Sequence, residues 1–239
     1  MGSSVPDFHI ERQPDDVTCG PTCLQAVYGH FGDSVPLDRV TSEVRELQTG
    51  GTLGALLGAH ALKRGYLATI YTCDLRLFDP TWFESRRDLA SLLEEQARVK
   101  PRPQLVAATE AYLDFLEAGG QVRFRPLEPP LLRAILKRGL PILTGLSATY
   151  LYGCAREREA EPRTLVYDDI RGDPVGHFVV IFGYDSEKRE AWLADPLHDN
   201  PFSGSRTYSV GIQRLLGAIF LGAGTYDANI LVLEPPERS

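Results

Sequence analysis

Two cysteines near the start of the chain are the first residues whose types and spacing could do chemistry. Cys19 stands directly before Gly20 and Pro21, and Cys23 follows one helical turn later. Proline is favoured in the first turn of a helix, so this order predicts that Cys19 lies at a helix N-terminus. The dipole and the free N–H groups there stabilise a thiolate, which is the nucleophilic form of cysteine. Gly20 has no side chain, and we expect it to leave space beside the sulfur for a substrate carbonyl.

A histidine and an aspartate in the last third of the chain could serve this nucleophile. His177 follows Gly176 and precedes an apolar run, which places it at the start of a predicted strand. Asp195 ends the next predicted strand, and a hairpin brings the end of its second strand near the start of its first. We therefore predict that His177 accepts the thiol proton and that Asp195 holds the far ring nitrogen. Gly176, at the rim of the sheet, is a candidate substrate-binding residue.

Acyl transfer to a thiol also needs hydrogen-bond donors for the oxyanion that forms on the attacked carbonyl. The backbone N–H of Cys19 is one candidate, and the side-chain amide of Gln13, six residues earlier, is the second. Pro14 stiffens the loop between them and helps to fix that amide. This chemistry requires no metal ion and no organic cofactor.

Each of these residues also has a plain structural interpretation. Cys19 could be a small buried hydrophobe, since free cysteine is among the most buried residue types. His177 could be a core histidine, Asp195 before a proline could end a strand in a turn, and Gln13 could lie on the surface. The presence of all four residues in this order favours the catalytic interpretation. Among the other histidines only His198, close after Asp195, merits a test.

The remaining three cysteines have weaker signals. Cys23 could form a metal or redox pair with Cys19, but a Cys-x3-Cys spacing alone lacks the second pair of ligands of a structural zinc site. Packing in the core is therefore the preferred interpretation of Cys23. Cys73 and Cys154 lie in no recognisable context and receive no role.

Helices come first along the chain and strands dominate its last third, which is the order typical of an α+β fold with a helical layer on an antiparallel sheet. Helices are predicted over residues 21–31, 37–47, 52–64, 82–99, 104–118, 130–137 and 211–221, and strands over 66–72, 122–125, 140–146, 175–184, 190–194, 206–209 and 228–233. We interpret residues 1–239 as one domain, with a helical insertion over 74–126 and an exposed, charged loop insertion over 154–174.

Charge and hydropathy exclude several classes of partner. The formal net charge of −7 disfavours electrostatic binding to nucleic acid or to an anionic membrane surface. The start of the chain lacks the pattern of a secretory signal, and no apolar run approaches the roughly 20 residues that span a bilayer. These observations predict a soluble, cytoplasmic protein that binds neither nucleic acid nor membrane, and they leave its oligomeric state open.

The motif formed by Gln13, Cys19-Gly20, His177 and Asp195-Pro196 resembles that of the C39 and C39-like cysteine peptidases. This family has a papain-like fold, and its bacterial members include peptidases that process bacteriocin leaders. The resemblance implies that Cys19 is the nucleophile, His177 the base, Asp195 the orienting group and Gln13 the oxyanion donor. It also implies a peptide or protein substrate. Thr18 departs from the family pattern, which often has aspartate directly before the nucleophile.

These observations together predict a cysteine peptidase that hydrolyses a peptide or amide bond through a thioester on Cys19. Two alternatives keep the same scaffold. An amine could replace water as the acyl acceptor, which would make the protein an acyl- or peptidyltransferase. The chain could also be a catalytically inactive, peptide-binding module.

Overall fold

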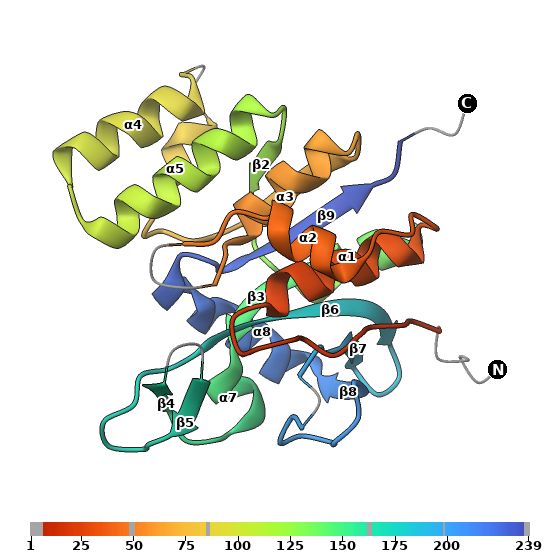
Figure 1. The fold of residues 1–239 in the computed structure, drawn as a ribbon. Helices are drawn as coiled ribbons and strands as arrows, with labels where there is room; N and C mark the ends of the chain where they lie inside the picture. The colour runs from red at the N-terminus through yellow and green to blue at the C-terminus, as the bar shows by residue number, and fades with distance from the viewer. Residues whose placement is uncertain (1–6, 48–50, 85–86, 162–163, 198, 237–239) are drawn as a thin grey trace.

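Seven strands form one sheet at the centre of the computed structural model, which describes residues 7–47, 51–84, 87–161, 164–197 and 199–236 (Figure 1). The strands are β1 (Leu67–Thr72), β2 (Gln121–Phe124), β3 (Ile142–Ser147), β6 (Gly176–Asp185), β7 (Glu190–Ala194), β8 (Thr207–Gly211) and β9 (Asn229–Glu234). Their order across the sheet is β2-β1-β9-β3-β6-β7-β8. Every neighbouring pair is antiparallel except β1 and β2. The predicted α+β class is confirmed, with one parallel pair at the edge of the sheet.

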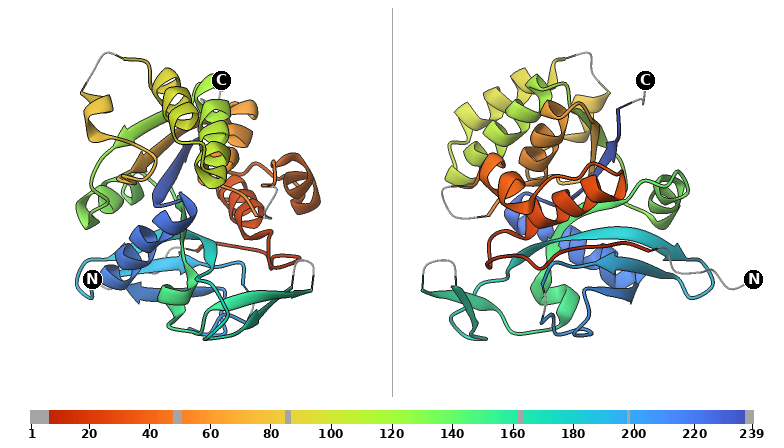
Figure 2. Two further views of the ribbon diagram at one scale, coloured as in Figure 1. Left: turned by 90° about the vertical axis from the view of Figure 1, so that its left-hand side faces the viewer. Right: turned by 45° about the vertical axis from the view of Figure 1, so that its right-hand side comes forward.

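Helices cover both faces of this sheet. The larger group comprises α1 (Cys19–His30), α2 (Leu37–Glu43), α3 (Gly54–Lys63), α4 (Leu89–Val99) and α5 (Pro103–Glu117). The remaining helices are α6 (Pro129–Leu136), α7 (Ala148–Tyr152) and α8 (Ile212–Leu221), with the short 3-10 turns η1 (Pro80–Phe83) and η2 (Gly222–Thr225). In both orientations of Figure 2, α1, α3, α4 and α5 lie in the upper half of the molecule and α8 lies in the lower half.

Strand β6 separates two hydrophobic cores because its side chains alternate between the faces of the sheet. Phe178 and Val180 belong to the core that contains the buried residues of α1, α3 and α5. Val179 and Ile181 belong to the core beneath α6 and α8. Burial on both faces explains why this strand reads as a continuous apolar run in the sequence.

Two segments differ from their sequence-based predictions. The helix predicted over 82–99 is replaced by η1 and α4, with residues 85–86 outside the described part of the chain. The charged stretch 154–174, predicted as a loop, contains a β-hairpin of β4 (Glu157–Glu161) and β5 (Thr164–Tyr167). Stretch 74–126 is helical through α4 and α5, and it supplies edge strand β2 where the sequence predicts a strand over 122–125. That these stretches are insertions into a smaller core remains a prediction.

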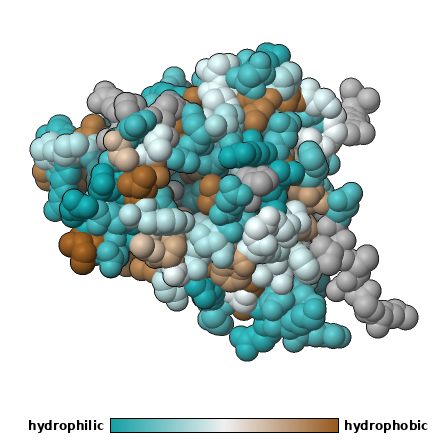
Figure 3. Space-filling model, turned by 60° about the horizontal axis from the view of Figure 1, so that its bottom comes forward, coloured by the Kyte–Doolittle hydropathy of each residue, from teal (hydrophilic) through white to brown (hydrophobic). Residues whose placement is uncertain are grey.

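The surface around the hairpin is mostly polar. Figure 3 shows this side of the molecule as predominantly hydrophilic, with its apolar side chains in small, separate groups. Within the described ranges, no helix has the length and apolar character needed to cross a membrane.

Asp227 is a buried carboxyl group on the α3 side of the sheet. Its Oδ1 accepts hydrogen bonds from the Gly54 backbone N–H at 3.0 Å and from Asn229 Nδ2 at 2.7 Å. A Cβ on Gly145 would lie 2.5 Å from Asp227 Oδ2, so the absence of a side chain there makes room for the carboxyl. Burial raises the pKa of Asp227 to about 7; the two hydrogen bonds oppose this effect, and the charge of Asp74 adds to it.

We expect Asp227→Asn to destabilise the fold less, or to stabilise it, as the pH rises. Because the folded-state pKa exceeds the unfolded value of about 3.9, the folded chain holds the extra proton between pH ~4 and ~7. The contribution of Asp227 to the free energy of unfolding therefore falls over this range, and asparagine removes that fall. We expect the free energy of unfolding of the variant, measured in urea, to rise by about 2–4 kcal/mol relative to that of the wild type between pH 4.5 and pH 8. A difference that does not change with pH would contradict the assignment.

Candidate active site

The nucleophile candidate begins α1, as the sequence predicts. Thr18 is the N-cap residue and makes no side-chain capping hydrogen bond, so its hydroxyl does not occupy the first N–H groups of the helix. The Cys19 residue is 9% exposed. A Cβ on Gly20 would lie 2.6 Å from Thr52 Cγ2 and 3.3 Å from a Phe178 ring carbon. Close packing of α1 therefore gives Gly20 a structural reason, and the access that it would leave for a carbonyl stays a prediction.

The sheet brings His177 and Asp195 together in the predicted way. Val180 pairs with Ala194, so Asp195, the first residue after β7, lies diagonally opposite His177. His177 Nε2 lies 2.9 Å from Asp195 Oδ1, and both side chains are buried. With Nε2 engaged by the carboxylate, Nδ1 is the ring nitrogen left for a thiol.

The Asp195 carboxylate is fully buried and accepts four hydrogen bonds. Oδ1 accepts from His177 Nε2 and from the Leu197 backbone N–H, the latter at 2.9 Å. Oδ2 accepts from the hydroxyls of Tyr152 and Tyr208, each at 2.7 Å. Burial alone would raise the pKa of Asp195, but His177 and the two hydroxyls outweigh it and lower the pKa. The group is therefore a stable anion that can orient and charge-balance an imidazolium.

Sequence reasoning did not identify the two tyrosines. Tyr208 lies on β8, where it pairs with Leu193, and its ring stacks on Phe202 at 5.5 Å. Tyr152 ends α7, a helix of five residues that is too short to leave a periodic signal. Burial and the Asp195 charge raise the pKa of both phenols, so each hydroxyl remains a donor.

Local contacts around α7 fix the position of Tyr152. The Ser147 hydroxyl caps the helix by accepting from the Tyr150 backbone N–H at 3.3 Å. Gly153 ends it in the left-handed region with φ of 69°. Arg214 Nε donates to the Leu151 carbonyl at 2.7 Å and so holds the last turn against α8.

We expect Tyr208→Phe to move the acidic limb of the pH–rate profile of the site to higher pH. The hydroxyl stabilises the Asp195 anion, so its loss makes that carboxylate easier to protonate. The rate at neutral pH should fall by no more than about 150-fold, since a hydrogen bond to a charged group is worth about 1.5–3 kcal/mol. Alkylation of Cys19 by iodoacetamide from pH 4 to 9 measures both effects. Tyr150→Phe, on α7 and outside the hydrogen bonds to Asp195, is the matched control, and an equal shift there would contradict a positioning role for Tyr208.

Charges on both sides of His177 favour its protonated form. Burial lowers the pKa of His177, but the Asp195 charge and hydrogen bond, followed by the effect of Cys19, raise it well above the ordinary value. Cys19 thus faces the ring closely enough to act on its protonation. The arrangement favours an imidazolium held between a sulfur and a carboxylate, which is the charge distribution of an activated thiol.

Gln13 lies beside the loop that leads into α1. Its backbone N–H donates to the Pro196 carbonyl at 3.0 Å, which ties it to the segment that follows Asp195. Its Nε2 donates to the Asp15 carbonyl at 2.8 Å, and the Thr18 hydroxyl donates to the same oxygen at 3.2 Å. An amide NH2 has two hydrogens, so one remains for a further acceptor. The Gln13 side chain is 7% exposed, and its Oε1 is buried without a hydrogen-bond partner.

The other predicted positions fall outside the triad. Cys23 is fully buried, and its thiol donates to the Phe178 carbonyl at 3.2 Å. Burial, followed by the charges of Cys19 and Asp195, raises its pKa, so Cys23 remains a packed thiol. Cys73 and Cys154 are half-buried free thiols, Gly176 is exposed at the start of β6, and His198 lies outside the described residues. No group of three or more histidine, cysteine or acidic residues that could hold a metal ion is found within those residues.

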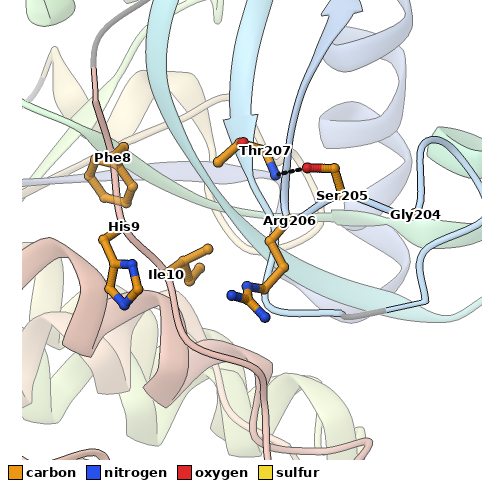
Figure 4. Close-up of a pocket in the computed structure, with 7 residues that line it drawn as sticks. All are labelled: Phe8, His9, Ile10, Gly204, Ser205, Arg206 and Thr207. Atoms are coloured by element: carbon orange, nitrogen blue, oxygen red, sulfur yellow. Dashed lines mark hydrogen bonds between the residues drawn. The ribbon is translucent and has the colours of Figure 1, made fainter.

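Two hollows flank the triad. A polar one of about 360 Å³ separates the segment Phe8-His9-Ile10 from the loop of residues 204–207 (Figure 4). One of its lining residues, Arg206, is joined to the backbone at the end of β7, because the Asp195 backbone N–H donates to the Arg206 carbonyl at 2.8 Å. A smaller cleft of about 20 Å³ beside the first turn of α1 has Val17, Pro21 and Val44 in its wall.

Comparisons with known proteins find similar solved structures, of which three are described here. No protein-family model matches the chain, and no curated protein sequence does. A candidate C39-like peptidase from Bacillus anthracis shares 14% identity over 97% of this chain and 96% of that chain, with a TM-score of 0.48. The peptidase domain of Streptococcus ComA, a bifunctional ABC transporter of a quorum-sensing pathway, shares 13% over 96% and 99%, with a TM-score of 0.45. Xylellain, a cysteine protease from Xylella fastidiosa, shares 15% over 98% and 85%, with a TM-score of 0.43. At these values the likeness assigns no residue a role.

Proposed function

We propose that the chain is a cysteine peptidase that hydrolyses a peptide or amide bond through a thioester on Cys19. The observation that carries the proposal is the buried contact of His177 with Asp195, whose remaining lone pairs are saturated by Tyr152, Tyr208 and Leu197. A carboxylate desolvated and satisfied in this way serves to hold an imidazolium in one orientation. Cys19 at the start of α1 is the nucleophile that this imidazolium faces.

The proposed reaction has two stages. The Cys19 sulfur attacks the carbonyl carbon, and His177 passes the proton taken from the thiol to the departing amine nitrogen as the C–N bond breaks. Water then attacks the thioester carbon, gives a proton to His177, and the C–S bond breaks to return the thiol and a free carboxylic acid. Asp195 holds the ring through both stages without taking up the proton.

The oxyanion needs donors in both stages. The Cys19 backbone N–H lies at the uncapped N-terminus of α1, where the helix dipole adds to its effect. The second Nε2 hydrogen of Gln13 is the other proposed donor, since the first is held by the Asp15 carbonyl. The resemblance to C39-like peptidases assigns Gln13 the same task.

A library of peptidyl electrophiles tests the proposal directly. Intact-mass analysis should show one adduct per chain, and peptide mapping should place it on Cys19. The best-labelling sequences then become amide substrates, assayed with and without an added amine. Release of free acid supports hydrolysis, whereas a product that contains the added amine would establish an acyltransferase. A chain that is alkylated equally at Cys73 and Cys19 would overturn both enzymatic proposals.

A further inference from the structure

The loop between β7 and β8 holds Asp195 at two points. The structure describes residues 195–197 and 199–206 of this loop. At its start, the Leu197 backbone N–H donates to Asp195 Oδ1 at 2.9 Å. At its end, the Arg206 carbonyl accepts from the Asp195 backbone N–H at 2.8 Å. The loop therefore contacts both the carboxylate and the backbone of the orienting residue.

A single buried amide closes this loop. Asn200 is 3% exposed, and its Nδ2 donates to the Ser205 carbonyl at 2.8 Å and to the Leu197 carbonyl at 3.3 Å. Its Oδ1 accepts from the backbone N–H groups of Phe202 at 3.2 Å and of Ser203 at 3.1 Å. Both amide hydrogens have an acceptor and both lone pairs of the oxygen have a donor, so these partners allow only one orientation of the amide.

The amide nitrogen joins the two points at which the loop holds Asp195. Leu197 supplies one acceptor with its carbonyl and binds Asp195 with its N–H. Ser205, the other acceptor, directly precedes Arg206, and Figure 4 shows these two residues at the end of the loop. All four hydrogen bonds of the Asn200 side chain go to backbone groups of the loop, so it acts on Asp195 through the loop.

The amide oxygen supports a second route to the carboxylate. It holds the backbone of Phe202, whose ring stacks on that of Tyr208 with 5.5 Å between the centroids. The Tyr208 hydroxyl donates to Asp195 Oδ2 at 2.7 Å. Asn200 thus supports contacts with both carboxylate oxygens, with Oδ1 through Leu197 and with Oδ2 through the stacked rings.

Burial makes these contacts difficult to replace. Asp195 is fully buried, so bulk water does not replace a hydrogen bond that its carboxylate loses. Burial of an amide is costly unless the amide is hydrogen-bonded, and that of Asn200 is saturated. A saturated polar side chain of this kind rigidifies the segment around it, and here that segment is a loop without regular secondary structure.

We propose that Asn200 is a positioning residue for Asp195 and acts by closing the β7–β8 loop. The closed loop keeps the Leu197 N–H on Oδ1 and the Tyr208 hydroxyl on Oδ2, so the carboxylate remains an anion in one orientation. His177 relies on this anion for its charge balance, so the action of Asn200 extends to the imidazolium. The catalytic meaning of this role rests on the proposed peptidase function, in which the carboxylate orients the base.

Asn200 can be replaced without any change of charge near Asp195. The titratable groups that act most strongly on this carboxylate come from four other elements: His177 of β6, Tyr152 of α7, Tyr208 of β8 and Cys23 of α1. Asn200→Ala removes the whole network. Asn200→Ser keeps a hydroxyl that can accept from the N–H groups of the turn, but it is too short to bridge the two carbonyls.

Ser203→Ala in the same loop is the matched control. The Ser203 hydroxyl donates to the Ser205 carbonyl at 3.1 Å and accepts from the Ser205 N–H at 3.0 Å. It therefore shares an acceptor with Asn200, but it connects neighbouring residues of the loop instead of its two ends.

The measured quantity is the pKa of His177, which requires neither a substrate nor a reactive thiol. Burial lowers this pKa, but the charge and hydrogen bond of Asp195 raise it to about 10. The ring nitrogens are followed by 15N NMR from pH 5 to 11, assigned by their loss in His177→Ala, and urea unfolding confirms that each variant is folded. Both Asn200 variants should lower the pKa by about half to one pH unit, because a loosely held carboxylate stabilises the imidazolium less. Ser203→Ala should leave it unchanged.

A second substitution decides whether Asn200 acts through Asp195. In the Asp195→Asn background, Asn200→Ala should not lower the pKa of His177 further, because the group that it positions carries no charge there. An unchanged pKa in both Asn200 variants, or an equal fall with and without the Asp195 carboxylate, would overturn the proposal. Alkylation by iodoacetamide reports the nucleophile separately: if Cys19 reacts no faster than a free thiol, the peptidase proposal fails while the titration still decides the role of Asn200.

Discussion

Cys19→Ala is expected to abolish the covalent adduct and to reduce peptide cleavage to the uncatalysed background. The sulfur is the only group that forms the thioester in the proposed reaction, so no neighbouring side chain can replace it. Cys23, the nearest other cysteine in sequence, is fully buried and donates its thiol hydrogen to the Phe178 carbonyl. Intact-mass analysis with the peptidyl electrophiles and kcat/KM for the derived amide substrates measure both losses.

Cys73→Ala is the matched control for this substitution. Cys73 is a half-buried free cysteine outside the triad, so its replacement should leave both adduct formation and kcat/KM unchanged. Thermal unfolding of both variants separates a chemical effect from a loss of structure. Cleavage that persists in Cys19→Ala would contradict the assignment of the nucleophile.

The second large effect is expected for Asp195→Ala, which should lower kcat/KM by about 10²–10⁴. The substitution removes the acceptor that fixes His177 and leaves the hydroxyls of Tyr152 and Tyr208 without their shared partner. Removal of one member of a buried ion pair costs about 3–5 kcal/mol, so the variant should also unfold at lower denaturant concentration. Steady-state kinetics and urea unfolding measure the two effects independently.

Asp195→Asn separates charge from shape in this prediction. Asparagine keeps the volume and one acceptor oxygen, and a tyrosine hydroxyl can rotate to accept from its NH2 group. The imidazolium loses its counter-charge, so the pKa of His177 should fall and the alkaline limb of the pH–rate profile should move to lower pH. Stability should fall less than in Asp195→Ala. An unchanged alkaline limb would show that Asp195 does not act through the charge of His177.

The place of Cys19 at the start of α1 and the contact of His177 with Asp195 could be predicted because each of these residues lies at a boundary that local sequence patterns define. Pro21 indicates the first turn of a helix, which begins at Cys19. The apolar run after His177 and the turn before β7 define a hairpin, and its register brings Asp195 to the histidine. Short-range sequence patterns define these helix and strand boundaries, so the boundaries could be predicted without knowledge of the tertiary packing.

The parts of the site that sequence did not reveal depend on long-range packing. Tyr152 reaches Asp195 from a helix of five residues that is held by Ser147 and Arg214, and no local pattern predicts that contact. The β4–β5 hairpin was predicted as a loop because its charged residues mask strand alternation. Two further contacts hold the hairpin. The Leu165 backbone N–H donates to Asp16, which is far away in the sequence, and Glu157 exchanges backbone hydrogen bonds with Asp173 across a turn.

The alkylation rate of Cys19 by iodoacetamide between pH 4 and 9, measured in the wild type and in His177→Ala, tests the central claim most directly. If His177 and Cys19 form the proposed pair, the wild type should react at pH 6 at least about tenfold faster than a free cysteine, which is nearly all protonated at that pH. His177→Ala should remove this advantage and leave a rate that rises only in the alkaline range. Slow alkylation of Cys19 at pH 6 in the wild type, or equal profiles for the two proteins, would contradict the account.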